Sequence, residues 1–185
     1  MSITVAKSAG FCFGVNRAVE LVERVAQKGK RVCTLGPIIH NRHAVAHFEE
    51  MGVRVISSPA EATSRDTVII RSHGVPKRIH DILETRGLRC VDATCPFVKK
   101  IHRIVEKESK AGKHIVIIGD ANHPEVQGIQ GWSESEVTII KTEEEAKAVA
   151  EAKKKAEQEL RDAEAEIASA KEDAAALEEP VYYVT

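Results

Sequence analysis

The chain repeats itself with an offset of 83 residues, and this repeat limits the possible folds more than any other feature. The offset places Cys12 on Cys95, Gly29-Lys30 on Gly112-Lys113 and His40 on His123 without a gap. Such self-similarity indicates that one supersecondary unit occurs more than once. Each copy predicts a strand, a loop with a cysteine, a helix, a Gly-Lys turn, a second strand, and a loop that ends in histidine.

Short β-branched runs alternate with amphipathic segments over residues 1–140. The predicted strands are 3–6, 32–35, 53–57, 67–71, 88–91, 114–118 and 137–140, and the predicted helices are 15–28, 42–51, 76–86, 97–111 and 125–131. This alternation favours an α/β fold with mostly parallel sheets.

The repeat also predicts how the chain is divided. Residues 52–62 match 136–146 with an offset of 84, and the strand at 180–185 matches the one that precedes His73. Because the second copy stops partway, we expect the chain to be truncated. The predicted organisation is a first α/β unit at 1–94, a second, incomplete unit at 95–146 and 180–185, and a helical insertion at 147–179.

The insertion differs in composition from the rest of the chain. It is rich in Ala, Glu and Lys, and its large apolar residues are only Val149, Leu160, Ile167 and Leu177. This weak heptad pattern predicts either a long, mostly solvated helix or an Ala-lined helical hairpin. Helix-mediated self-association is the alternative to a solvated helix.

Charge and composition exclude several functions. Residues 141–185 hold 7 Lys/Arg against 13 Asp/Glu, a net of −6, so residues 1–140 have a net of +5, which suits an anionic ligand. Without a dense basic run, we expect no nucleic-acid partner. Apolar runs of four or five residues exclude a membrane span, and the absence of a signal-like start predicts a cytoplasmic protein.

Two of the four cysteines are candidate metal ligands. Cys12 and Cys95 each lie in a loop just before a predicted helix, where backbone N–H groups and the helix dipole stabilise a thiolate. Two thiolates related by a repeat suit an iron–sulfur cluster bound from separate loops. Cys33 and Cys90 lie within predicted strands, so we expect both to be buried and without a ligand role.

Three histidines, His40, His73 and His123, each follow a predicted strand and precede a turn. Loops at the carboxyl ends of parallel strands bind ligands in α/β proteins, so these imidazoles are candidate donors to a phosphate or diphosphate. Glu125 is either a proton-transfer partner of His123 or a glutamate favoured by a helix start. We interpret the remaining five as surface or packing residues: His43, His47, His80, His102 and His114.

Five segments, GFCFGVNRAVE, TLGPIIHN, IIRSHGV, DATCPFVKKIH and IIGDANHPEVQGI, resemble signature segments of the 4-hydroxy-3-methylbut-2-enyl diphosphate reductase family, in the family's order over residues 1–146. The resemblance implies a three-lobed fold of related α/β units, each with three layers, around a central [4Fe-4S] cluster. It also implies the reductive dehydroxylation of (E)-4-hydroxy-3-methylbut-2-enyl diphosphate to isopentenyl and dimethylallyl diphosphate, in the non-mevalonate pathway of isoprenoid biosynthesis.

The resemblance assigns roles to individual residues. It implies that Cys12 and Cys95 are two of three cluster ligands, with one coordination site left open for substrate. It further implies that Glu125 relays protons, that an external electron donor such as ferredoxin or flavodoxin is needed, and that three histidines contact the diphosphate: His40, His73 and His123.

The chain also departs from the family. The third cysteine ligand is absent, and the segment at 147–179 matches nothing in the family. We therefore expect this chain alone to be an inactive fragment of an oxidoreductase. The alternative is a non-catalytic iron–sulfur or helical interaction protein built on a partial reductase scaffold, which the number of cluster ligands would distinguish.

Overall fold

The computed structural model describes residues 3–7, 9–29 and 31–177. The chain forms two compact units, Met1–Ile139 and Ile140–Thr185. The first unit contains all of the candidate site residues. The division into two repeat units and an insertion stays a prediction.

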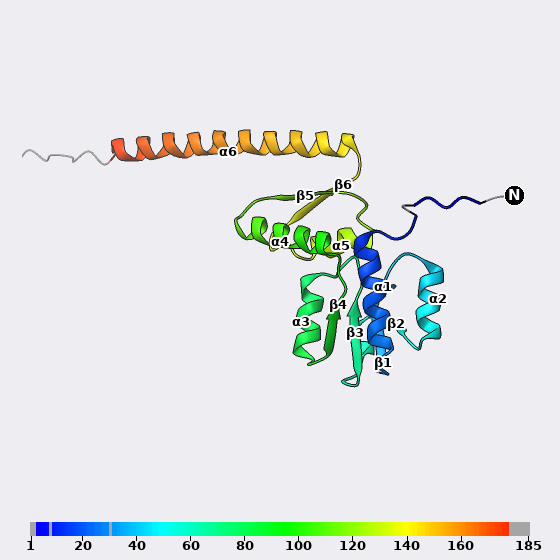
Figure 1. Cartoon of the computed structure of the whole chain (residues 1–185). Helices are drawn as coiled ribbons and strands as arrows, with labels where there is room; N and C mark the ends of the chain where they lie inside the picture. Colours follow the sequence, from blue (N-terminus) through cyan, green and yellow to red (C-terminus); the bar gives the residue numbers. More distant parts are fainter. Residues whose placement is uncertain (1–2, 8, 30, 178–185) are drawn as a thin grey trace, which may run out of the picture. The chain divides into compact units, whose positions relative to one another are not determined.

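Helices and strands alternate along the described part of the chain (Figure 1). In chain order the elements are α1 (Phe13–Ala26), β1 (Arg31–Leu35), α2 (Arg42–Glu50), β2 (Arg54–Ile56), a short 3-10 helix η1 (Pro59–Glu61), β3 (Asp66–Ile70), α3 (Lys77–Thr85), β4 (Arg89–Asp92), α4 (Pro96–Lys110), β5 (Ile115–Ile118), α5 (Pro124–Gln130), β6 (Val137–Ile140) and α6 (Glu143–Leu177). Six predicted strands and all five predicted helices are confirmed within a few residues.

The main sheet has four parallel strands in the order β2-β1-β3-β4. A smaller sheet pairs β5 with β6. The order α1-β1-α2-β2 recurs as α4-β5-α5-β6, as the sequence repeat predicts. Because the four strands are parallel, their carboxyl ends lie at one edge of the sheet.

Helices cover both faces of the main sheet. One apolar cluster joins the sheet to α1 and α2 and includes Ala18, Val22, Phe48, Val32 and Ile69. The second joins the opposite face to α3 and includes Leu83, Cys33, Val68 and Ile70. Alternate strand residues point to opposite faces, so both clusters share the same strands. The expected three-layer α/β unit is confirmed.

The prediction of a strand at residues 3–6 is wrong. These residues have no regular secondary structure, and Ile3 and Val5 are 90% and 74% exposed. An alternating apolar pattern forms a strand only beside a partner strand, and no described strand pairs with this segment. The predicted strand at 180–185 lies outside the described residues.

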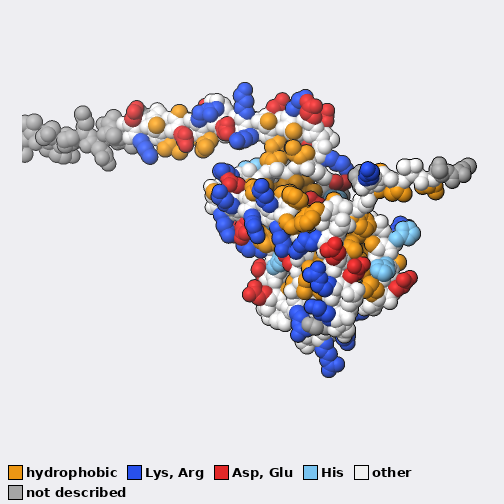
Figure 2. All heavy atoms as spheres, viewed as in Figure 1, with side chains coloured by type: hydrophobic (Ala, Val, Ile, Leu, Met, Phe, Trp, Pro, Cys, Tyr) orange, Lys and Arg blue, Asp and Glu red, His pale blue; other side chains and the backbone are white. Residues whose placement is uncertain are grey.

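Helix α6 begins at Glu143, four residues before the predicted start. Thr142 Oγ1 accepts a hydrogen bond from the Glu145 N–H (3.2 Å), and Glu145 Oε2 accepts one from the Thr142 N–H (3.3 Å), which forms a capping box. From residue 150 to residue 172 every side chain is exposed, and Figure 2 shows charged and hydrophobic side chains interspersed along the helix. The prediction of a largely solvated helix is confirmed for these residues.

None of the helices in the described part of the chain combines the length and the apolar composition that a membrane-spanning helix needs.

Candidate active site

Three of the candidate residues lie in loops that follow strands of the main sheet, and Figure 1 shows where these strands end. His40 follows β1, His73 follows β3, and Cys95 follows β4. Backbone hydrogen bonds continue beyond the sheet and hold these loops together. Ser72 N–H and Oγ–H both donate to the Ile38 carbonyl (3.2 and 2.9 Å), and the Cys95 N–H donates to the Ser72 carbonyl (2.9 Å).

Cys12 and Cys95 occupy equivalent places in their helices. Each is the N-cap residue, of α1 and α4 respectively, and neither side chain makes a capping hydrogen bond. Cys12 is exposed and Cys95 is partly buried. Both thiols therefore lie at the N-terminus of a helix, as the sequence predicts.

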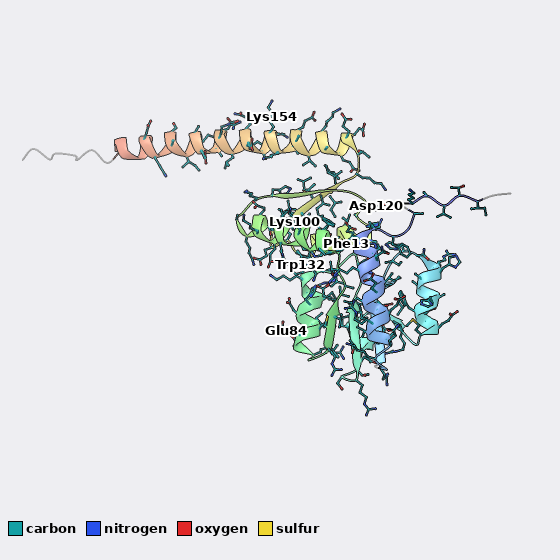
Figure 3. The ribbon with its side chains drawn as sticks, viewed as in Figure 1. Phe13, Glu84, Lys100, Asp120, Trp132 and Lys154 are labelled. Carbon is teal, nitrogen blue, oxygen red and sulfur yellow. The ribbon has the colours of Figure 1, made fainter. Side chains whose placement is uncertain are left out.

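The structure brings the N-termini of α1 and α4 together. The Sγ atom of Cys95 lies so close to Gly14 that a Cβ at position 14 would collide with it. The Arg17 guanidinium donates a hydrogen bond to the Thr94 carbonyl (3.2 Å) and links the same two segments. Phe13, labelled in Figure 3, begins α1 between Cys12 and Gly14.

The three predicted histidines converge, although they come from three loops. The ring centroids of His40 and His73 are 4.4 Å apart, and the ring of His123 lies 5.8 Å from His40 and 6.0 Å from His73. Three imidazoles at these distances can surround one small anion.

His73 is the most strongly perturbed of the three. Burial, with further contributions from His40, Arg71 and His123, lowers the pKa of His73 to about 4. Its Nδ1 atom is buried and has no hydrogen-bond partner among the described residues. The ring is therefore neutral at pH 7, and a bound anion would favour its protonation.

His123 and Glu125 are held together at the start of α5. His123 is the N-cap residue, and its Nδ1 accepts a hydrogen bond from the Glu125 N–H (3.2 Å). In the neutral ring the proton then lies on Nε2, so His123 can donate from that atom. The Glu125 carboxylate lies in the first turn of α5, partly buried, where it can accept or release a proton.

The other two cysteines differ from each other. Cys33 is fully buried in β1, and burial raises its pKa to about 11, which is consistent with a packing role. The prediction that Cys90 is buried is wrong, because this residue is exposed. The reason is that β4 is an edge strand of the sheet, which the sequence alone does not reveal.

Two of the remaining histidines pack against an aromatic ring. His102, which is 3% exposed, stacks on Trp132 with centroids 5.1 Å apart, and His80 meets the same ring edge-on at 5.4 Å. Trp132, labelled in Figure 3, donates its indole N–H to the Val75 carbonyl (3.0 Å). The predicted packing role is confirmed for His102.

Several residues that shape the site were not predicted. Gly14 makes room for Cys95, and Arg17 joins α1 to the loop before α4. Arg71 donates from Nε to the Gly74 carbonyl (3.3 Å), next to His73. The only sequence signal for Arg17 was its match with basic Lys100 in the repeat.

These features define an α/β repeat protein in which paired cysteine-bearing helix starts lie at the same sheet edge as a histidine cluster. The family model described as LytB protein matches residues 3–176, and the chain belongs to this family. Because this match includes residues 147–176, the expectation that the segment at 147–179 matches nothing in the family is wrong for those residues.

Similar proteins occur in several bacteria. The 4-hydroxy-3-methylbut-2-enyl diphosphate reductase of Caldanaerobacter subterraneus subsp. tengcongensis is 49% identical over 150 residues, which is 79% of this chain and 52% of that protein. The Clostridioides difficile reductase is 46% identical over 146 residues, 78% of this chain and 52% of that protein. The chain thus spans about half the length of the curated relatives it matches.

Solved structures of reductases with these names have a similar fold. One structure of (E)-4-hydroxy-3-methyl-but-2-enyl diphosphate reductase, the terminal enzyme of the non-mevalonate pathway, superimposes with a TM-score of 0.67 at 42% identity, over 77% of this chain and 52% of that one. The E-1-hydroxy-2-methyl-but-2-enyl-4-diphosphate reductase of Plasmodium falciparum gives a TM-score of 0.69 at 30% identity, over 72% and 42%.

Proposed function

We propose that this chain forms part of the active site of a reductase that converts (E)-4-hydroxy-3-methylbut-2-enyl diphosphate to isopentenyl and dimethylallyl diphosphate. The observation that carries the proposal is the convergence of three imidazoles within 6.0 Å at the same sheet edge as Cys95, whose thiol packs against the start of α1. The reaction breaks the C–O bond to the hydroxyl group, takes up two electrons and two protons, and releases water.

The residues present fit two ligands of a [4Fe-4S] cluster. Cys12 and Cys95 lie at adjoining helix N-termini, and Gly14 leaves space beside the second thiol. Within the described residues no group of three His, Cys, Asp or Glu side chains is placed to hold a metal ion, so a further ligand has to come from elsewhere. When bound, the cluster would supply electrons from an external carrier such as ferredoxin or flavodoxin.

The histidine cluster would bind the diphosphate. His73 and His123 would donate hydrogen bonds to phosphate oxygens, and the negative charge of the ligand would favour protonation of His73. His40 completes the ring of donors at 4.4 Å from His73. Diphosphate binding thereby fixes one end of the substrate and orients its hydroxyl group.

Glu125 would deliver protons to the leaving hydroxyl group. It lies two residues from His123, which contacts the diphosphate in this proposal, and its partly buried position allows it to exchange protons with solvent. We place the reaction in the cytoplasm, where thiols stay reduced.

Anaerobic reconstitution with iron and sulfide tests the cysteine assignment. We expect Cys12→Ser and Cys95→Ser each to lower the bound iron and the visible absorption of the reconstituted chain. Cys90→Ser is the matched control, because Cys90 is also exposed but lies on an edge strand. Equal iron content in all three variants would show that Cys12 and Cys95 are not ligands.

Binding of inorganic diphosphate to the cluster-free chain tests the histidine assignment. His40→Ala and His123→Ala should each weaken binding by about tenfold, since each removes a hydrogen bond to a charged group. His43→Ala is the control, because His43 is exposed in the first turn of α2. If the control and the two cluster variants bind equally well, the diphosphate assignment is wrong.

A further inference from the structure

A second cavity, of about 430 Å³, lies beyond the carboxyl ends of β1 and β3, next to the start of α3. Its lining includes Leu35, Ser57, Arg71, Arg78, Ile79 and Gln127. None of the three clustered histidines lines it, so it is separate from the proposed diphosphate site. Its volume lies within the range of small-molecule sites, about 300–1,000 Å³.

Positive charge in this cavity is not balanced by the protein. The guanidinium of Arg71 is partly buried against Gly36, and burial lowers its pKa. Its Nε donates to the Gly74 carbonyl, but the described residues provide no ion pair to Arg71 or Arg78. No Asp or Glu lines the cavity. A partly buried cation without a counter-charge is costly, and an anion would offset that cost.

The remaining lining is suited to an amphiphilic ligand. Leu35, Val75 and Ile79 belong to the apolar cluster between the sheet and α3 and also line the cavity. Ser57 and Gln127 add hydrogen-bonding groups. The first turn of α3, a helix of nine residues, contributes the positive end of its dipole.

We propose that this cavity binds a small organic phosphate or diphosphate with a short apolar group, with the phosphate at Arg71 and Arg78 and the apolar group against Leu35 and Ile79. This site is distinct from the histidine cluster, because none of the three histidines lines the cavity. Arg71 also holds the Gly74 carbonyl beside His73, so a ligand of this cavity contacts the histidine loop through one residue. The choice of dimethylallyl diphosphate as a probe rests on the proposed function. The inference that the cavity binds an amphiphilic phosphate rests only on the charge and lining of the cavity.

Backbone amide NMR of the cluster-free, 185-residue chain can separate the two sites. Titration with dimethylallyl diphosphate should shift the amides of Gly36, Ser57 and Ile79, which report on the cavity, and those of Asn41 and Glu125, which report on the histidines. Inorganic diphosphate should bind the cavity about tenfold more weakly, because it lacks the apolar group. Equal affinity for the two probes at the cavity amides contradicts an amphiphilic ligand.

Arginine variants test the charge argument. Arg78→Gln and Arg71→Gln should each weaken binding at the cavity amides by about tenfold or more, since each removes charge-assisted hydrogen bonds. Arg65→Gln makes the same charge change at an exposed turn outside the cavity and should have no effect. His40→Ala should change the shifts of Asn41 and Glu125 only. If the proposed diphosphate site is wrong, these two amides will not respond to the probe, whereas the cavity amides still can. No shift of the cavity amides up to about 1 mM probe, or shifts that survive both arginine variants, would overturn the proposal.

Discussion

Gly14 is the residue on which the approach of the two cysteine loops depends. It is buried in the first turn of α1, and its missing side chain leaves the space that the Cys95 thiol occupies. Its backbone is helical, so its role here is to provide space rather than an unusual conformation. A larger residue would push the starts of α1 and α4 apart.

Gly14→Ala tests this role. Alanine favours helix, so α1 should remain intact by circular dichroism. The new methyl group should displace Cys95, and we expect the iron affinity of the reconstituted chain to fall by about 10- to 100-fold, as for other changes that misplace a metal ligand. Glu20→Ala, on the exposed side of the same helix, is the control. Unchanged iron affinity in Gly14→Ala would mean that Cys95 does not need this space.

His102 should make the stability of the protein depend on pH. Burial, reinforced by His80 and Lys99 and opposed by Asp92, lowers its pKa to about 4. An unfolded histidine takes up a proton near pH 6.5, whereas folded His102 does not until about pH 4, so stability falls as the pH drops through this window. His73 has a similarly lowered pKa and contributes in the same direction.

We expect His102→Leu to reduce this dependence. The free energy of unfolding, measured in urea at pH 7.5 and at pH 5, should differ less in the variant than in the original chain, by on the order of 2 kcal/mol. His43→Leu, at an exposed position, should leave the difference unchanged. The same pH difference in both variants would show that folding does not lower the pKa of His102.

At the scale of elements, the sequence predicted those helices, strands and loops whose formation depends on residues close together in the chain. Strands such as β3, buried over its whole length, were visible as β-branched runs, and the cysteine and histidine loops were visible because the repeat marks them twice. The prediction of a strand at residues 3–6 was wrong because a strand also needs a neighbouring strand to pair with. Gly14 and Arg71 were missed because they act through contacts with Cys95 and Gly36, far along the chain, which leave no local pattern.

Helix α6 should contribute little to the stability of the α/β unit. Its large apolar residues Leu160 and Ile167 are 60% and 56% exposed, and its ion pairs, such as Lys147–Glu143 at 2.7 Å, are local i,i+4 pairs. Such pairs are worth only about 0.3–0.5 kcal/mol each.

Deletion of residues 147–179 is therefore expected to change the free energy of unfolding of the α/β unit by no more than about 0.5 kcal/mol. Sedimentation of the full chain and the deletion variant over a range of concentrations is the companion measurement. Concentration-dependent association that disappears on deletion would favour the alternative in which this helix binds a second copy.

At the scale of the whole molecule, the proposed function makes this chain one part of a larger site. It covers about half the length of its relatives, and within the described residues no group of three His, Cys, Asp or Glu side chains is placed to hold a metal ion. A cluster held by two thiolates would be more exposed and more easily lost than one held by three. In the proposed function the histidines bind the diphosphate, so we expect weak binding of the diphosphate to survive in this chain.

We expect the 185-residue chain, reconstituted anaerobically and supplied with a strong reductant, to turn over the diphosphate substrate at least about 100-fold more slowly than a full-length family member. The reason is that substrate and cluster would both be open to water. A steady-state assay decides the matter. Comparable turnover would mean that the residues of this chain suffice for the reaction.

The parallel order β2-β1-β3-β4 has a consequence for the folding of the chain during its synthesis on the ribosome. Strand β4 ends at Asp92, three residues before Cys95, so the nascent chain completes its first sheet just as it delivers the second cysteine. Domains generally fold as units during synthesis, N-terminal part first. The hydrogen bond from the Cys95 N–H to the Ser72 carbonyl would then fix the backbone at Cys95, and with it the position of the side chain, while the following residues are still being translated.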